Sequence, residues 1–285
     1  MLAIKRSEKL DSAIDARRLI ATFLALTLAL SLPSYWLAVS GGTLGILSVS
    51  LMWAPGVAAM LTMIIHRRSL RELGWRLGKV KYLLVAYLLP LGYSAVVYVP
   101  TWALVQGAFD PVLPAAASAA PSIGTYVAIM ATLGILQSLI TAVGEEIGWR
   151  GLLVPQLARV TSFRNSALIS GVIWVLWHSP VLLFADYNAG APPLFSLTCF
   201  AVMVVGLSFA FAWLRLVSGS LWPAALLHAS HNLFVQGIFD VMTGQTDSTI
   251  YITGEFGVGL MLAGVVVGYV FWRLWSRDHS VAETS

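Results

Sequence analysis

The stretch Leu194–Val217 reads LFSLTCFAVMVVGLSFAFAWLRLV and holds a single charged residue, Arg215, close to its carboxyl end. A helix needs about 20 mostly apolar residues to cross the hydrocarbon core of a bilayer, so this stretch predicts a transmembrane helix. Seven further stretches are predicted in the same way: Leu19–Val39, Gly45–Ile65, Tyr82–Trp102, Tyr126–Gly144, Ala167–Phe184, Leu221–Phe239 and Phe256–Trp275. The sequence therefore predicts an all-α, polytopic integral membrane protein with about eight transmembrane helices.

The composition supports this fold class. Charged residues make up only 11% of the 285-residue chain, hydrophobic residues make up 58%, and the mean hydropathy is +0.82. A soluble globular protein carries about 25% charged residues, because its surface has to be solvated. The composition excludes a disordered chain, a small secreted disulfide scaffold and a nucleic-acid binder built on a charged domain. No nucleic-acid partner is expected, and the single cysteine, Cys199, excludes an intramolecular disulfide.

The positions of the basic residues predict the orientation of the chain, since Lys and Arg accumulate in short cytoplasmic loops. With eight spans and a cytoplasmic amino terminus, all 17 Lys and Arg residues fall on the cytoplasmic side. We therefore expect both termini in the cytoplasm. The segment Met1–Arg18 is expected either to lie as an amphipathic helix on the inner leaflet or to form a partly ordered tail. The predicted outer loops hold only acidic charges: Asp110, Asp186, Asp240, Asp247 and Glu255.

The first cluster of ionisable residues is Gly144-Glu145-Glu146-Ile147-Gly148-Trp149-Arg150, at the inner end of the fourth predicted span. Ionisable residues are costly inside a bilayer and usually face a cavity that has a function. Glu146 and Arg150 are four residues apart and can pair on one helix face, whereas Glu145 points elsewhere. A desolvated carboxylate without a cationic partner is suited to act as a general base. The alternative is a solvated helix end that carries an ordinary ion pair.

Two further clusters lie in the fifth and seventh predicted spans. The fifth holds Trp174-Val175-Leu176-Trp177-His178, with His178 near the middle of the membrane. The seventh holds His228-Ala229-Ser230-His231-Asn232, in which His228 and Asn232 share a helix face and His231 lies on its flank. Two donors one helical turn apart could hold the oxygen of a tetrahedral intermediate. The alternative for each cluster is an ordinary polar contact with a neighbouring helix.

The three clusters together are more specific than any one of them. A base candidate, imidazole groups and an amide donor are what water-mediated hydrolysis of an amide bond requires. His228 lies in the inner half of its span, as Glu145 does, so the cavity between them is expected to open toward the cytoplasm. The order Glu-Glu-x-x-x-Arg, aromatic-x-x-x-His and His-x-x-x-Asn resembles the intramembrane endopeptidases related to the type II CAAX prenyl protease, often called the CPBP or Abi family. The resemblance covers about Tyr126–Phe239.

The resemblance implies a role for each residue that matches a motif. Glu145 resembles the glutamate that activates the hydrolytic water, and His178 resembles the histidine that assists it. His228 and Asn232 resemble the pair of donors that stabilises the oxyanion. His231 has no counterpart in the pattern of the family.

The remaining matches concern support and domain organisation. Glu146 and Arg150 resemble the supporting residues of the first motif. The second motif of the family usually begins with Phe, and Trp174 stands at that position here, a difference that affects the shape of the pocket rather than the chemistry. We expect residues 1–125 to form an amino-terminal tail and the first three transmembrane helices, and residues 126–239 to form the CAAX-protease-like catalytic core. Residues 240–285 then supply an outer loop, the last transmembrane helix and a cytoplasmic tail.

The resemblance implies a hydrolase, an intramembrane endopeptidase that cuts a membrane-associated protein or peptide, for example a prenylated CAAX-type protein. Its expected partners are this substrate and the lipid bilayer, and its expected location is the plasma (inner) membrane of a prokaryote. Zinc is a possible cofactor, because Glu145, His178 and His228 could bind it and leave a position for water. We favour a metal-independent mechanism, since asparagine is a poor zinc ligand and a good oxyanion donor. An ion- or proton-coupled transporter and a non-catalytic immunity or scaffold protein remain as alternatives.

Overall fold

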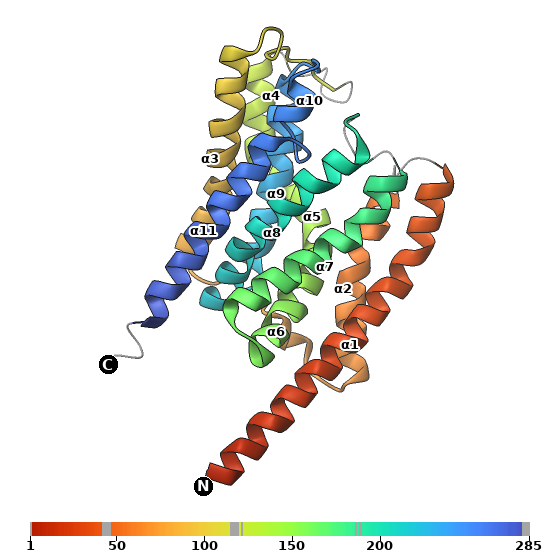
Figure 1. Cartoon of the computed structure of the whole chain (residues 1–285), viewed down its shortest axis with the longest axis vertical. Helices are drawn as coiled ribbons and strands as arrows, with labels where there is room; N and C mark the ends of the chain where they lie inside the picture. The colour runs from red at the N-terminus through yellow and green to blue at the C-terminus, as the bar shows by residue number, and fades with distance from the viewer. Residues whose placement is uncertain are drawn as a thin grey trace.

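The computed structural model describes residues 2–41, 47–114, 120, 122–185, 187 and 190–280. Within these ranges the regular structure is helical and no β-strand forms, as the composition predicts. Seven helices of the described chain are long and apolar enough to cross a membrane. The protein is therefore an all-α integral membrane protein, and Figure 1 shows its helices packed as one bundle.

The helices follow the order of the predicted spans. The beginning of α1 and the end of α11 lie at the same end of the bundle (Figure 1), as an even number of crossings requires. The cytoplasmic location of this end stays a prediction. In chain order the α-helices are α1 (Leu2–Gly41), α2 (Leu47–Ile65), α3 (Val80–Leu104), α4 (Ile123–Ile129), α5 (Ile135–Glu146), α6 (Val154–Val160), α7 (Phe163–Phe184), α8 (Pro193–Ser218), α9 (Trp222–Asn232), α10 (Thr249–Ile252) and α11 (Val258–Ser280).

The fourth predicted span ends in the wrong place. The sequence predicts its end at Gly144, directly before two glutamates, but the helix continues from Ile123 to Val160, over 38 residues. The glutamates do not end it, because both are buried inside the bundle and find partners there. The first charge after an apolar run is therefore not the end of this helix.

The seventh predicted span, Leu221–Phe239, is helical but is not one of the seven long apolar helices. It consists of α9 followed by a π-helical segment, Leu233–Phe239. Its histidines, asparagine and glutamine lower its mean hydropathy below that of the seven long apolar helices. Most of its side chains are buried, so α9 is an inner helix that is shielded from lipid by its neighbours.

Three π-helical segments interrupt the helices of the second half. They are Met130–Gly134 between α4 and α5, Ile147–Leu153 between α5 and α6, and Leu233–Phe239 after α9. Glu146 and Asn232 are the last residues before two of these segments. Short π-helical turns inside α-helices occur frequently at functional sites, because they change which side chains face a cavity.

Glycines allow α2 and α5 to pack with their backbones in contact. A methyl group on Gly144 would lie 2.8 Å from the carbonyl oxygen of Met52, and one on Gly148 would lie 2.6 Å from Pro55. Small residues permit this close approach between membrane helices. The approach fixes the turn of α5 that carries Glu145 and Glu146 against α2.

The amino-terminal segment is part of α1, which runs without a break from Leu2 to Gly41. It is therefore neither a separate amphipathic helix nor a partly ordered tail over its described residues. Asp15 of α1 accepts a hydrogen bond at 3.0 Å from Arg68, which lies just beyond the end of α2. Asp15 also lies 3.4 Å from Arg159, which is on α6. These exposed contacts connect three helices at the end of the bundle that carries the amino terminus.

Candidate active site

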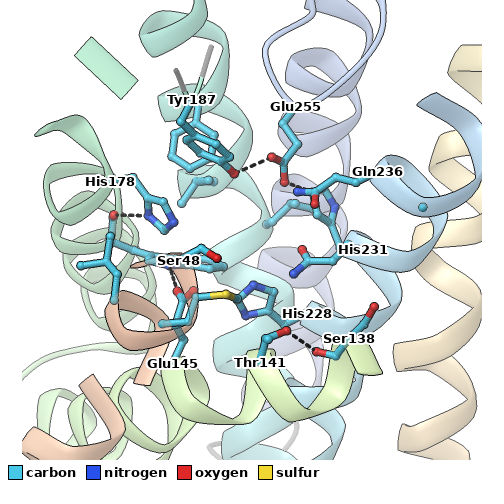
Figure 2. A pocket seen from close by; sticks show the side chains of 18 of the residues that line it. Ser48, Ser138, Thr141, Glu145, His178, Tyr187, His228, His231, Gln236 and Glu255 are labelled. Atoms are coloured by element: carbon cyan, nitrogen blue, oxygen red, sulfur yellow. Dashed lines mark hydrogen bonds and ion pairs between the residues drawn. The ribbon is translucent and has the colours of Figure 1, made fainter. Parts of the chain in front are cut away.

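A cavity of about 430 Å³ lies among α2, α5, α7, α8 and α9 (Figure 2). The four residues predicted to act in catalysis all line it, although they come from three different helices. The structure therefore brings together what the sequence holds up to 87 positions apart. The four are Glu145, His178, His228 and Asn232.

Glu145 is buried, with 1% of its surface exposed. Its Oε2 atom accepts hydrogen bonds from the indole nitrogens of Trp174 at 2.7 Å and Trp149 at 3.3 Å. No Lys, Arg or His among the described residues forms an ion pair with it. Trp174 thus holds the carboxylate in place through a neutral donor, which the Phe usual at this position could not provide. The expectation that Trp174 affects only the shape of the pocket is therefore wrong, because its indole contacts the candidate base. The Glu145 carboxylate enters the cavity with one oxygen fixed and without an ion pair, although Arg150 and His228 lie near enough for their charges to act on it.

Glu146 faces away from the cavity and makes the predicted pair with Arg150. Its Oε1 atom accepts from Nη1 of Arg150 at 2.8 Å, and the pair is fully buried. The Arg150 guanidinium lies 4.2 Å from the ring of Trp174 and 4.0 Å from that of Phe211. Aromatic faces attract a cation, and the attraction is strongest where water is excluded. Arg150 of the first motif therefore contacts Trp174 of the second. Because Glu146 and Arg150 are both buried, the alternative of a solvated helix end with an ordinary ion pair is excluded.

His228 is also held by Glu146, because its Nδ1 atom lies 3.0 Å from Oε1 of that residue. A carboxylate only accepts, so Nδ1 carries the proton and Nε2 is the nitrogen that remains for the cavity. The predicted pairing of Glu146 is thus confirmed, and a second partner joins it. One carboxylate oxygen orients both Arg150 and His228, which come from different helices.

His178 has a similar arrangement on the opposite helix. Its Nδ1 atom lies 3.0 Å from the carbonyl oxygen of Trp174, which can only accept, so Nδ1 donates and Nε2 holds a lone pair. Trp177 and Tyr187 pack against the ring, at centroid distances of 4.7 Å and 6.1 Å. The backbone and these aromatic rings fix the imidazole, and its basic nitrogen is available to a water molecule.

Asn232 is the last residue of α9 and lines the cavity. Its carboxamide makes no hydrogen bond to any side chain or backbone group of the described chain. His228 lies one turn earlier on the same helix face, as the spacing predicts. The two residues therefore present an imidazole and a free amide donor to one cavity.

A second group of polar residues lines the cavity opposite Glu145, and sequence reasoning missed most of it. Figure 2 shows Glu255 and Tyr187 on one side of the cavity and Glu145 on the other. Glu255 accepts from Nε2 of His231 at 2.8 Å and from the hydroxyl of Tyr187 at 2.7 Å, and His231 also bonds Tyr93 through Nδ1. We call Tyr93, Tyr187, His231 and Glu255 the Glu255 group. The position of Glu255 directly before the last span was the only signal in the sequence.

The Glu255 group keeps its carboxylate ionised. Burial acts to raise the pKa of Glu255, but the hydrogen bond and charge of His231 and the hydrogen bond of Tyr187 outweigh it and lower the pKa to about 2. Burial and the nearby charge of Glu255 raise the pKa of Tyr187 well above its ordinary value, so this hydroxyl stays a donor. The carboxylate is engaged at both oxygens, unlike that of Glu145.

The residues considered as zinc ligands do not fit a metal ion. Among the residues that the structure describes, no three His, Cys, Asp or Glu side chains are arranged to hold one. Their contacts, two indoles for Glu145, the carbonyl of Trp174 for His178 and Glu146 for His228, leave the Nε2 atoms of both histidines free, so it is the separation of the three side chains that does not suit a metal ion. We therefore derive no step of the reaction through a metal.

The comparison with family models agrees with the motifs. Residues 127–234 match the model described as type II CAAX prenyl endopeptidase Rce1-like, and this range contains all the predicted site residues. The match lies within the predicted Tyr126–Phe239, and it supports a protease of the CAAX type with a protein substrate in a membrane. No curated protein matches the chain. The three motifs and the four predicted catalytic residues therefore lie in the segment that is similar to the type II CAAX prenyl endopeptidases, whereas α2 and Glu255, which also line the cavity, lie outside it.

Proposed function

We propose that this protein is an intramembrane endopeptidase that hydrolyses a peptide bond with a water molecule activated by Glu145, without a metal. The observation that carries the proposal is that Glu145 is buried in the cavity without an ion pair to any described residue, while His178 and Asn232 line the same cavity. A carboxylate in this setting can accept a proton, and the neighbouring imidazole can accept or return one.

The reaction follows from these positions. Water lies between Glu145 and the Nε2 atom of His178; Glu145 takes a proton from it, and the oxygen attacks the carbonyl carbon of the scissile bond. The new carbon–oxygen bond moves an electron pair onto the carbonyl oxygen. The amide of Asn232 donates to this oxyanion, and so does Nε2 of His228 when it is protonated. The carbon–nitrogen bond then breaks, and the proton held by Glu145 passes to the departing amine.

Glu146 and Arg150 support this site without entering the cavity. Glu146 orients His228, and Arg150 fills the space between Trp174 and Phe211, so that the indole of Trp174 keeps its contact with Glu145. A catalytic group has to be held closely to its productive geometry, and such supporting contacts do this. The buried pair therefore connects the base, the assisting helix and the oxyanion donors.

The substrate we propose is a membrane-associated protein or peptide, for example a prenylated CAAX-type protein, in the plasma membrane of a prokaryote. Exposed Gln137 of α5 lines the cavity, so the cavity reaches the surface of the helix bundle. In the proposed orientation, Glu145 lies in the inner half of the membrane and the site opens toward the cytoplasm. Glu255, from a predicted outer loop, lines the same cavity, so the cavity also extends toward the opposite face.

Cysteine labelling tests this orientation. In a Cys199→Ala background, we expect the cysteine of Ser69→Cys to be protected from a membrane-impermeant reagent in whole cells, and that of Ser248→Cys to be labelled. Ser69 lies between α2 and α3, and Ser248 precedes α10. Labelling of both positions, or of position 69 alone, contradicts the proposed orientation.

The proposed activity is tested by comparing membrane peptides from cells that express the intact protein or the Glu145→Gln variant. Mass spectrometry should find new peptide ends only with the intact protein. Glu72→Gln serves as a matched control, since it changes a glutamate outside the cavity. Identical peptide ends in all three samples, with both variants present in the membrane, would exclude the peptidase.

A further inference from the structure

A second hollow lies on the outer surface of the bundle, formed by α7, α8 and α11. It has a volume of about 600 Å³ and shares no residue with the candidate active site. Figure 1 shows α8 between α7 and α11. One charged residue, Arg164 of α7, lines this groove, and the other lining residues are aliphatic, aromatic or glycine. We call it the α8 groove.

The floor of the α8 groove is formed by backbone where α8 meets α11. A methyl group on Gly206 would lie 2.2 Å from the carbonyl oxygen of Gly264, and one on Gly268 would lie 3.0 Å from that of Gly206. No larger side chain can fill this place without moving a helix. Val202 and Val265 lie along the groove with 37% and 49% of their surface exposed. The groove is therefore an apolar channel on the outer surface of the bundle, where the exposed valines would face lipid.

One end of the α8 groove is cationic. Arg164 is the second residue of α7, is exposed and forms no ion pair with a described residue. The amino terminus of a helix adds a partial positive charge. Trp272 and Tyr269 line the same end, because the start of α7 contacts the last turns of α11, where Phe163 stacks on Trp275 at 4.3 Å. Aromatic rings of this kind mark the boundary between membrane and water.

The length of the α8 groove matches one leaflet of a bilayer. Ala201 and Phe209 line it eight residues apart, which corresponds to about 12 Å along a helix. Half of a hydrocarbon core of about 30 Å is about 15 Å. The groove thus runs from a cationic end at the membrane boundary to about the middle of the membrane.

We propose that the α8 groove binds an anionic phospholipid, with its phosphate at Arg164 and one acyl chain along the glycine floor. The charge selects the head group, and the apolar channel selects the chain. A basic side chain near an anionic membrane surface contributes about 1 kcal/mol, which corresponds to about a fivefold preference over a zwitterionic lipid.

Native mass spectrometry of the full chain in detergent tests the proposal, with phosphatidylglycerol and phosphatidylcholine of the same acyl chains as probes. The intact protein should bind phosphatidylglycerol about fivefold more tightly. Arg164→Gln should remove this preference, whereas Ala201→Phe, which fills the groove, should weaken binding of both lipids. Two controls should behave like the intact protein: Arg76→Gln, an exposed arginine outside the groove, and Leu176→Phe, an exposed apolar position on α7.

Two results would overturn the proposal. If Arg76→Gln removes the preference as fully as Arg164→Gln does, the lipid responds to overall charge rather than to the groove. If the intact protein is a dimer that Ala201→Phe converts to a monomer with unchanged lipid binding, a second copy of the chain occupies the groove. Because Arg164 is exposed, Arg164→Gln should keep the thermal unfolding midpoint of the intact protein, which separates loss of lipid from loss of fold.

Discussion

Two buried carboxylates face the candidate active-site cavity from opposite sides, and their partners differ. Glu145 is held at one oxygen by two neutral indoles, whereas Glu255 is held at both oxygens, by an imidazole and a phenol. The partners of Glu255 stabilise its charge and leave it little tendency to take a proton. Those of Glu145 orient the group without neutralising it. Both carboxylates are buried, so the difference indicates that the hydrogen-bond partners, more than burial, decide whether a buried carboxylate can act as a base or stays ionised in a structural role.

The strongest test of this comparison replaces each carboxylate by its amide. Glu145→Gln should lower turnover of a cleaved substrate by about 10²–10⁴-fold or more, since that is the usual contribution of a general acid or base. Glu255→Gln should lower it by less than about tenfold. Initial rates on a substrate found by peptide mass spectrometry measure both. Equal losses in the two variants would contradict the distinction, as would near-normal turnover by Glu145→Gln.

Asn232 tests which donor stabilises the oxyanion near Glu145. Asn232→Ala should lower kcat by about 10²–10³-fold with little change in KM, because the donor acts on charge that develops in the transition state. Asn232→Asp should be as damaging or worse, since a carboxylate repels the oxyanion. A metal-ligand role predicts the opposite order, together with inactivation of the intact enzyme by a chelator. Active Asn232→Asp and chelator-sensitive turnover would refute the oxyanion assignment.

Glu146 is proposed to stabilise the fold around the site and not to take part in the reaction. Glu146→Gln removes one partner of a buried ion pair, which typically costs about 3–5 kcal/mol of folding free energy. Glu72→Gln is a matched control, because Glu72 and Arg68 also lie four residues apart but are exposed, and such a pair contributes less than about 1 kcal/mol. Unfolding in detergent measures both variants. Equal stability of the two variants would show that the Glu146 pair contributes little.

The smallest effect concerns Asp240, near the Glu255 group. Burial raises the pKa of Asp240 to about 7, although a hydrogen bond from Tyr98 acts in the opposite direction. An acid whose pKa rises on folding destabilises the protein as pH increases from its unfolded pKa to its folded pKa. Stability should therefore fall between pH 5 and pH 8, by no more than about 3 kcal/mol, since about two pH units at 1.36 kcal/mol each separate pH 5 from the folded pKa.

Asp240→Asn should remove this part of the pH dependence, as followed by the thermal unfolding midpoint at both pH values. Glu255 makes no contribution in this range, because its folded pKa of about 2 lies below its ordinary value and the group is ionised in both states. Its stabilising effect is lost only at pH values below about 4.5. An unchanged slope in Asp240→Asn would assign the pH dependence to another group.

The sequence predicts the fold class and the local pair between Glu146 and Arg150, and there is a physical reason for each. The length of the apolar stretches can be read directly from the sequence, and it is sufficient to predict an all-α membrane protein. The orientation that the basic residues predict stays a prediction. The pair between Glu146 and Arg150 is local to one helix, so helical periodicity is sufficient to predict it. The family resemblance is likewise confirmed over residues 127–234. The roles of the individual site residues stay predictions.

The remaining features depend on contacts between distant segments. The helix that carries Glu145 continues past Gly144, because charges that would end a span in lipid find partners inside the bundle. The seventh predicted span, Leu221–Phe239, is absent from the long apolar helices of the described chain, because it carries the polar side chains of the site and its hydropathy is therefore low. Glu255 lies 24 residues beyond His231 in the sequence and meets it only because the chain folds back. Helical periodicity cannot predict a contact of this kind.

The π-helical segment Ile147–Leu153 has a consequence for how the chain can change in length. A π-helix uses more residues per turn than an α-helix, so such a segment behaves like an inserted residue that the helix has absorbed. Removing one residue after Arg150, between Gly151 and Leu153, should restore ordinary α-helical pitch locally and leave Glu145, Glu146, Trp149 and Arg150 in place. Removing one residue from α5 between Ile135 and Gly144 would instead rotate both glutamates by about 100° about the helix axis, away from their partners. The helix that carries the candidate base should therefore tolerate a change of length on one side of the two glutamates and not on the other.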